Sequence, residues 1–406
     1  MPPPLSLSTG LAAAGSAAAA VLLWLYPSSG VTDGLIGAAF LFALFRWREC
    51  RGVWLSPAGL AALLMAAYPV AQLAWAVDPS ESARALVRDF RIPAGAFALS
   101  VFASDGRRID RALLVSALVL LPVFAADLVR LHQALGPDFP ALARYHKPHL
   151  LNHPNVSSML AAAACLICLY GAWTRRARRP AAAGLALGAL LALAYLVVMA
   201  SRGPQAAFAA AAGAAFLLVP RTWKGRATSL ALAAAAAVAI GLNLETINAR
   251  FSEKGDPLSG RQAVWRHTVK LIGERPWFGY GYGKETFQEV YRTSNPPRSP
   301  HVFPHPHQYG LFVLFQGGRA WLVLHAALWT LLAVRLGRAL AGERDERRRL
   351  RLVLIGLLLI QWQAYGLADY PDNRLKLAFA ALVPLALAAS APREAQDDST
   401  LTRTSV

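Results

Sequence analysis

The sequence predicts an all-α polytopic membrane protein with about twelve transmembrane helices and a large, partly helical outward-facing loop before the last three. Hydrophobic residues make up 56% of the 406 residues, and the mean hydropathy is +0.38. A soluble domain cannot hide that much apolar surface, so lipid must be the main solvent. Long apolar runs recur along the chain, and basic residues gather in alternate connectors between them.

About twelve apolar runs approach the ~20 residues that cross a bilayer as a helix. Because Val31–Phe45 and Pro204–Val219 are short, a count different by one or two stays open. The predicted spans are Leu11–Tyr26, Val31–Phe45, Ala58–Ala76, Leu86–Ala103, Ala112–Leu131, Val156–Trp173, Ala181–Ala200, Pro204–Val219, Ala227–Leu242, Gln308–Val334, Leu352–Leu367 and Leu375–Ala391.

The basic residues predict the orientation of these spans. The positive-inside rule places connectors rich in arginine and lysine in the cytoplasm, and both chain termini with them. The connectors 131–155 and 243–306 then face outward. The formal charge of +18 is explained by this topology and by contact with anionic lipid, so no nucleic-acid partner is predicted. The basic connectors contain Arg46, Arg48 and Arg51; Arg107, Arg108 and Arg111; Arg175, Arg176, Arg178 and Arg179; Arg221, Lys224 and Arg226; and the run Arg335–Arg351.

The outward loop before the last three spans is too long to be a simple connector, so we expect a small folded cap. The pattern Ser259-Gly260-Arg261-Gln262 predicts a helix start, and Gly273 and Pro276 predict its end. A second short helix is expected around Lys284–Tyr291. Nine basic residues against six acidic ones suit the cap to an anionic ligand. The predicted organisation is 1–242, helices 1–9 of the bundle; 243–306, the cap; 307–391, helices 10–12; and 392–406, a cytoplasmic tail.

Three histidines, His301, His305 and His307, precede the span that begins at Gln308. The positive end of a helix dipole disfavours the imidazolium form, so a neutral imidazole is expected there. A neutral imidazole at a lipid–water boundary is suited to act as a general base, and His307 is the candidate because it adjoins the helix start. A metal site is the alternative, but no carboxylate or cysteine accompanies the cluster in sequence. His301 can also be a structural histidine satisfied by loop backbone.

Arginines at the predicted outer boundary are further candidates, and one more arginine is expected deeper in the membrane. Arg202 lies between two spans, where Gly203 and Pro204 permit a sharp turn. Its guanidinium matches a phosphate with paired donors, although it can also simply anchor a helix end. Arg88 and Arg91 flank Asp89, and they either form a surface pair with it or share the same anion. Arg319 is expected near mid-membrane, roughly 18 Å below His307 at ~1.5 Å per helical residue.

Four local motifs at these positions resemble the O-antigen ligase/polymerase superfamily of bacterial envelope enzymes. The resemblance also covers the architecture, since such enzymes have about twelve spans and one large periplasmic loop before the last three. Gln308 stands where asparagine is commoner, and the segment 316–319 lacks an acidic residue often found before its glycine. The motifs are His153-Pro154-Asn155, Ser201-Arg202-Gly203, Pro276–Phe287 and His305-Pro306-His307-Gln308, with Gly318 following.

This resemblance implies a GT-C-like glycosyltransferase in the bacterial inner membrane with its active site facing the periplasm. Its implied donor is a glycan on undecaprenyl diphosphate, its acceptor a hydroxyl of the lipid A–core oligosaccharide, and the transfer inverting and independent of metal or other cofactors. By position, His307 would deprotonate the acceptor and Arg202 would hold the leaving diphosphate. Arg261 or Arg266 would be the second clamp, and Arg88, His305 and His301 are further substrate-binding candidates.

Two other functions stay open. An O-antigen polymerase or a protein O-oligosaccharyltransferase belongs to the same superfamily. A transporter of lipid-linked oligosaccharides belongs to another class and would predict intramembrane charges and helices broken near mid-membrane.

Overall fold

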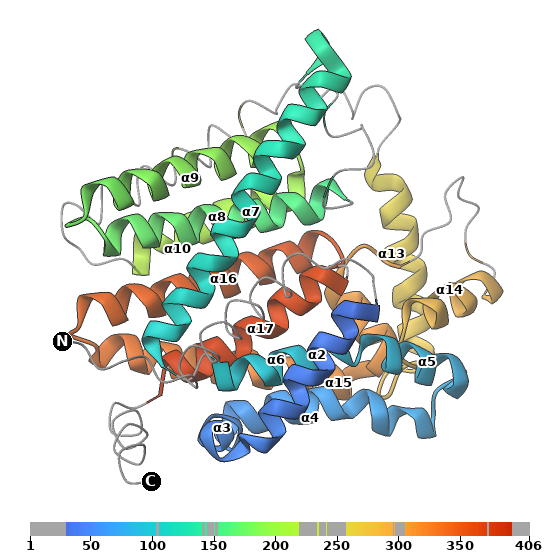
Figure 1. The fold of residues 1–406 in the computed structure, drawn as a ribbon. Helices are drawn as coiled ribbons and strands as arrows, with labels where there is room; N and C mark the ends of the chain where they lie inside the picture. Colours follow the sequence, from blue (N-terminus) through green and yellow to red (C-terminus); the bar gives the residue numbers. More distant parts are fainter. Residues whose placement is uncertain are drawn as a thin grey trace.

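In the computed structural model, the structure describes residues 30–102, 105–139, 143, 150, 153–218, 234, 241, 257–294, 296, 305–371 and 373–391. Every regular element among them is a helix and none is a strand, which confirms the all-α class (Figure 1). The helices are α2 (Gly30–Phe45), α3 (Trp47–Trp54), α4 (Pro57–Ala71), η1 (Gln72–Ala74), α5 (Pro79–Asp89), α6 (Arg91–Phe102), α7 (Gly106–Leu135), η2 (Gly136–Asp138), α8 (Pro154–Thr174), α9 (Arg179–Val198), α10 (Arg202–Leu218), α13 (Pro257–Glu274), α14 (Lys284–Thr293), α15 (Tyr309–Gly342), α16 (Glu346–Ala368) and α17 (Asn373–Ala389).

Six of the described helical segments are long and apolar enough to cross a membrane, which indicates a multi-pass membrane protein. Leu11–Tyr26 and nearly all of Ala227–Leu242 lie outside the described residues, so a total of about twelve stays a prediction. The six segments are Pro57–Ala74, Gly106–Asp138, Pro154–Thr174, Arg179–Val198, Tyr309–Gly342 and Glu346–Leu367.

The predicted span Leu86–Ala103 is divided between two helices. Asp78 caps α5 by accepting a hydrogen bond from the backbone N–H of Glu81 at 2.9 Å, and α5 ends at Asp89. This helix is largely polar, and the apolar remainder forms the 12-residue α6. The sequence-based boundary was wrong because the apolar run begins inside the last turn of the polar helix.

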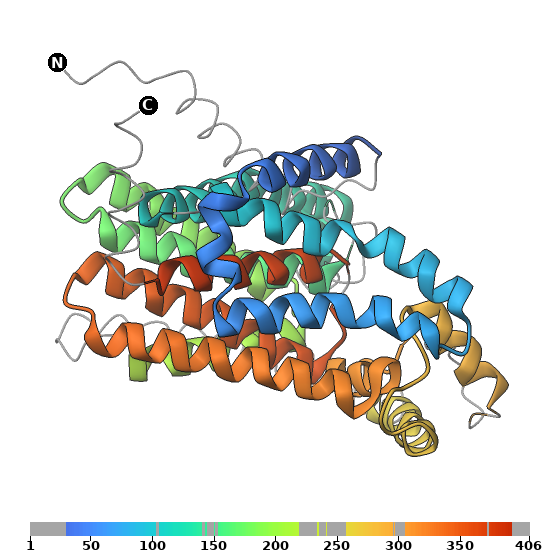
Figure 2. The same cartoon turned by 90° about the horizontal axis from the view of Figure 1, so that it is seen from below.

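The two cap helices are arranged as the sequence predicts. α13 begins at Pro257, two residues before the predicted start, and ends at Glu274, just after Gly273. α14 covers the second predicted helix. Both lie together at one end of the helical bundle, next to α5 (Figures 1 and 2). The face of the membrane toward which this end points stays a prediction.

Helix α15 is broken at Gly318, whose φ of 65° and ψ of −163° are not helical. A side chain there would collide with the backbone of Trp277, so only glycine fits. The break releases backbone groups that the cap loop 276–281 satisfies with four hydrogen bonds. They are Tyr280 N to Phe315 O at 2.9 Å, Gly281 N to Gln316 O at 3.1 Å, Arg319 N to Pro276 O at 2.8 Å, and Ala320 N to Trp277 O at 3.1 Å.

This break changes the position of Arg319. The expected depth of roughly 18 Å below His307 assumed an unbroken helix. Instead Arg319 begins the second half of α15, is exposed, and places its guanidinium 5.3 Å from the ring centre of Trp277 in the cap loop. The arginine therefore lies against the cap.

A buried ion-pair cluster joins α7, α8 and α16 near the first residues of α16. Asp110 of α7 is 2% exposed and accepts hydrogen bonds from Arg351 at 2.6 and 3.1 Å and from Arg347 at 2.9 Å. The hydroxyl of Tyr170 in α8 donates to the same carboxylate at 2.6 Å. This cluster fixes the start of α16. The candidate site lies at the opposite end of the same helix.

Candidate active site

His307 lies immediately before the cap residue of α15. Gln308 is the N-cap and accepts a hydrogen bond from the backbone N–H of Leu311, so the helix begins at Tyr309 as expected. His307 itself has a φ of 51°, a left-handed conformation that is costly for a residue with a side chain. Such strain, held by the surrounding structure, is common at functional sites.

The His307 ring is held by a carboxylate from the far end of α16. Its Nδ1 lies 3.0 Å from Oδ1 of Asp369. Because an ionised carboxylate only accepts, Nδ1 must carry the proton, and Nε2 is left as the acceptor nitrogen. The side chain of His307 is 23% exposed, so part of the ring is accessible from outside the protein. This is the arrangement of an oriented general base.

Asp369 is fixed from a second side by α8. The side-chain amide of Asn155 donates to Oδ2 of Asp369 at 2.8 Å. Asn155 is in the first turn of α8, where Pro154 follows the cap residue His153, whose Nδ1 accepts the Asn155 N–H at 3.1 Å. Two neutral donors therefore hold the carboxylate that orients His307.

Asp369 stays ionised in this setting. Burial raises its pKa, and the hydrogen bond and electrostatic interaction with His307 lower it. The backbone N–H of Tyr370, at 2.8 Å, and the positive charge of Arg261 act in the same direction. The net result is a pKa of Asp369 below its ordinary value.

His305 supports the same loop. Its Nδ1 accepts the backbone N–H of His307 at 3.3 Å, and its ring centre lies 4.6 Å from that of Tyr370. Burial and the neighbouring His307 lower the pKa of His305 to about 3, so the ring is neutral at any ordinary pH. A neutral His305 can hold the backbone of His307 but cannot supply a cation to a substrate.

Arg202 and Arg261 share the neighbourhood of this dyad. Arg202 is the first residue of α10 and is half-buried; burial and the charge of Arg261 both lower its pKa. The charge of Arg261 also acts on Asp369, so three elements converge here. The chain turns at Ala200, which has a φ of 46°, whereas Gly203 and Pro204 belong to the first helical turn. The turn predicted at Gly203-Pro204 is thus displaced to Ala200.

The cap helix α13 is tied to the histidine loop. The indole N–H of Trp265 donates to the backbone oxygen of Pro306 at 2.6 Å. Arg261 lies one turn earlier on α13 and is half-buried. Two guanidinium groups held together repel each other, and an anion placed between them removes that cost. The arrangement suits a phosphate next to the base.

Residues 187–319 of the chain match the family model described as O-antigen ligase. This match supports membership of the O-antigen ligase superfamily. The matched segment begins in α9, passes through the cap and ends just after the break of α15, so it contains Arg202, Arg261 and His307. The match indicates a glycosyltransferase-like enzyme that works on lipid-linked substrates. No curated protein matches the chain.

The remaining predicted residues are placed differently. Arg266 is exposed on α13. Arg88 forms a two-pronged ion pair with Glu285 of α14 at 2.8 and 3.1 Å, and Glu285 raises the pKa of this arginine. Arg88 thereby joins α5 to α14. His301 lies outside the described residues.

Sequence reasoning missed Asp369 altogether. It directly follows an apolar span and lies 62 residues beyond His307, so no local pattern connects the two. A carboxylate at the end of the next predicted span was the available signal. Asn155 belonged to a recognised motif but had no role assigned. Within the described part of the chain, no three histidine, cysteine or acidic side chains are grouped in a way that could hold a metal ion.

Proposed function

We propose that this protein is a glycosyltransferase that moves a glycan from undecaprenyl diphosphate to a hydroxyl of the lipid A–core oligosaccharide, at the periplasmic face of the inner membrane. The observation that supports this most is the His307–Asp369 pair, joined at 3.0 Å, with Arg261 close enough for its charge to act on both Asp369 and Arg202. This combination provides a base for the acceptor and cations for the leaving group. The superfamily match supports lipid-linked substrates.

In the proposed reaction, Nε2 of His307 takes the proton of the acceptor hydroxyl while its oxygen attacks the anomeric carbon of the donor. The bond from that carbon to the diphosphate oxygen breaks, and the electron pair leaves with the diphosphate. Arg202 and Arg261 stabilise the negative charge that develops there. Attack opposite the leaving group inverts the anomeric configuration, and no metal ion takes part.

The break in α15 is the feature that a transporter would share. However, all four backbone groups named at the break are bonded to the cap loop, and the neighbouring Arg319 lies against Trp277. The break therefore serves to dock the cap onto α15. This favours a fixed site beneath the cap over a moving one.

The test is reconstitution of the purified protein in vesicles with a glycan on undecaprenyl diphosphate and a rough lipopolysaccharide acceptor. The proposal expects glycan joined to lipid A–core, with diphosphate carrier released. Longer glycan chains without any joining to lipid A–core would identify a polymerase instead, and movement of intact donor across the vesicle without any sugar transfer would identify a transporter.

The same assay tests the diphosphate contact through Arg202→Lys. Lysine keeps the charge but loses the paired donors of guanidinium. Hydrogen bonds to charged groups contribute about 1.5–3 kcal/mol, so we expect a loss of roughly tenfold to a hundredfold in kcat/KM for the donor. Arg266→Lys, on the exposed part of α13, is the matched control and should leave the rate unchanged. Equal rates for wild type and Arg202→Lys would remove this residue from the proposed site.

A further inference from the structure

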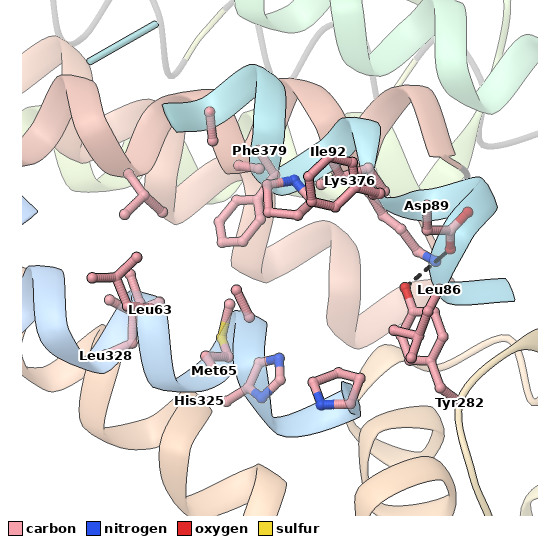
Figure 3. Close-up of a pocket in the computed structure, with 18 of the residues that line it drawn as sticks. Leu63, Met65, Leu86, Asp89, Ile92, Tyr282, His325, Leu328, Lys376 and Phe379 are labelled. Carbon is pink, nitrogen blue, oxygen red and sulfur yellow. Dashed lines mark hydrogen bonds and ion pairs between the residues drawn. The ribbon is translucent and has the colours of Figure 1, made fainter. Parts of the chain in front are cut away.

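A cavity of about 510 Å³ lies between α4, α5, α6, α15, α16 and α17 (Figure 3). This volume is in the range of small-molecule sites. Its walls are almost entirely apolar, with Leu63, Met65, Leu328 and Phe379 among the lining side chains. None of the groups assigned above as base or diphosphate clamp lines it, so it is distinct from the His307–Asp369 pair.

The acidic and basic side chains that line the cavity, Asp89 and Lys376, lie together at one end. There the hydroxyl of Tyr282 donates to Oδ2 of Asp89 at 3.0 Å, and Nζ of Lys376 lies 3.8 Å from the same oxygen (Figure 3). Lys376 also lies 4.7 Å from the centre of the Tyr370 ring. The polar end thus combines a lysine–aspartate ion pair with two phenol rings.

This polar end adjoins the catalytic loop. Tyr370 lines the cavity and directly follows Asp369. On its other side, the Tyr370 ring centre is 4.6 Å from that of His305, which in turn is 4.3 Å from His307. The rings of Tyr370 and His305 therefore lie between the cavity and the proposed base. The cavity and the base are thus neighbours on either side of these two rings.

The cavity is also open along one side. Large apolar lining residues of α4, of α5 and of the α5 C-cap are exposed at the protein surface: Leu63, Val70, Val87 and Phe90. Val87 is 79% exposed and Val70 59% exposed, which is costly in water but natural against lipid. We therefore regard this side as an opening toward the bilayer. A chain already dissolved in the membrane can enter through it without crossing water.

We propose that this groove binds the first isoprene units of the donor's polyprenyl chain, with Lys376 at the phosphate that bears the chain. This inference rests on the proposed function. In such a donor only the diphosphate separates the anomeric carbon from the chain, so the chain must begin close to His307. In a lipid A–core acceptor, an oligosaccharide separates the reacting hydroxyl from the acyl chains. Adjacency to the base thus favours the donor's chain as the occupant.

A substitution that fills the groove tests this proposal. Ala66 lines the groove but is exposed, so Ala66→Trp adds volume without overpacking the buried core. Ala67 is the next residue of α4, is equally exposed and does not line the groove, so Ala67→Trp is the matched control. Each variant is assayed with two donors that bear the same glycan, one on undecaprenyl diphosphate and one on a single isoprene diphosphate.

We expect Ala66→Trp to raise KM about tenfold for the long-chain donor, equivalent to about 1.4 kcal/mol. Its KM for the short-chain donor and for the acceptor should not change, and Ala67→Trp should behave as wild type. Lys376→Met should raise KM for both donors, because both have the phosphate. An equal loss with long and short donors for Ala66→Trp would overturn the proposal, as would a rise in acceptor KM alone, which would assign the groove to an acyl chain.

A binding measurement separates this proposal from the proposed function. Undecaprenyl phosphate with a photoreactive group on its first isoprene units should label Met65 or Leu63 in the wild-type protein, and Ala66→Trp should reduce the labelling. If that labelling occurs but wild type transfers no sugar, the groove assignment stands and the proposed function fails. Labelling outside the groove would overturn the groove assignment even where transfer is observed.

Discussion

Two buried aspartates near opposite ends of α16 show how the partners of a carboxylate decide its role. Asp110 contacts two arginines near the start of this helix, whereas Asp369 contacts a histidine and an amide just after its end. Arg351 and Asp369 are separated by about 27 Å at ~1.5 Å per residue. Both carboxylates are buried, at 2% and 7% exposure.

The difference lies in what the partners can do with a proton. A guanidinium does not lose its proton in proteins, so the Asp110 cluster can only hold α7, α8 and α16 together. An imidazole changes protonation state readily, so the carboxylate of Asp369 can orient His307 and stabilise its cation. Asp110 should therefore matter for folding, and Asp369 for chemistry.

The largest effect is expected for Asp369→Asn. An amide at this position can donate to Nδ1 of His307, which moves the ring proton to Nε2 and removes the acceptor lone pair. We expect kcat to fall by about 10²–10⁴ while the melting temperature changes little. Asp127→Asn is the control, since Asp127 is also buried but bonds Tyr195, Arg130 and the backbone of Leu150. Activity retained in Asp369→Asn would show that Asp369, like Asp110, only stabilises the fold.

Asp110→Ala should give the converse result. It leaves Arg351 as a buried cation without its carboxylate, and breaking a buried pair in this way costs about 3–5 kcal/mol. We expect a strongly lowered melting temperature in detergent, or no folded protein, with near-normal kcat in whatever fraction folds. A folded variant with normal stability and lost transfer would reverse the assignment of the two ends.

A smaller effect is expected for Asn155→Ala, which removes one hydrogen bond from Asp369 but leaves His307 and the Tyr370 N–H in place. A loss of about 0.5–1.5 kcal/mol corresponds to a twofold to tenfold lower kcat with unchanged KM. Ser158→Ala, on the same face of α8, is the control because its buried hydroxyl has no hydrogen-bond partner. Identical kcat values for the two variants would show that Asp369 does not need this second contact.

The smallest effect is expected for the contribution of His305 to stability at acidic pH. Its folded pKa of about 3 lies below the ordinary 6.5, so below pH 6.5 the unfolded chain takes up a proton that the folded chain refuses. Stability attributable to His305 is thus present above pH 6.5 and is lost as the pH falls toward 3. In His305→Gln, the decrease in melting temperature between pH 7 and pH 4.5 should be smaller than in wild type. An equal decrease in both proteins would contradict the neutral assignment.

The sequence predicted one side of the site better than the other. Arg202 and His307 stand out locally, because a basic residue at a helix end predicted to face outward and a histidine before a span are both unusual. Arg261 was a candidate only through the resemblance, as an alternative to Arg266. Asp369 and Asn155 become functional only through contacts across 62 and 214 residues, which no local pattern contains. The sequence did not predict the contact of Arg319 with the cap for a related reason. The left-handed φ of Gly318 depends on the cap loop packed against it.

The central claim is that His307 is the base of a glycan transfer, and the most direct test is the transfer rate per folded enzyme in His307→Asn. Asparagine tolerates the left-handed φ at this position, so the backbone should be preserved while the imidazole is lost. The account predicts a rate at least about 100-fold below wild type at an unchanged melting temperature. A rate within about threefold of wild type would contradict it.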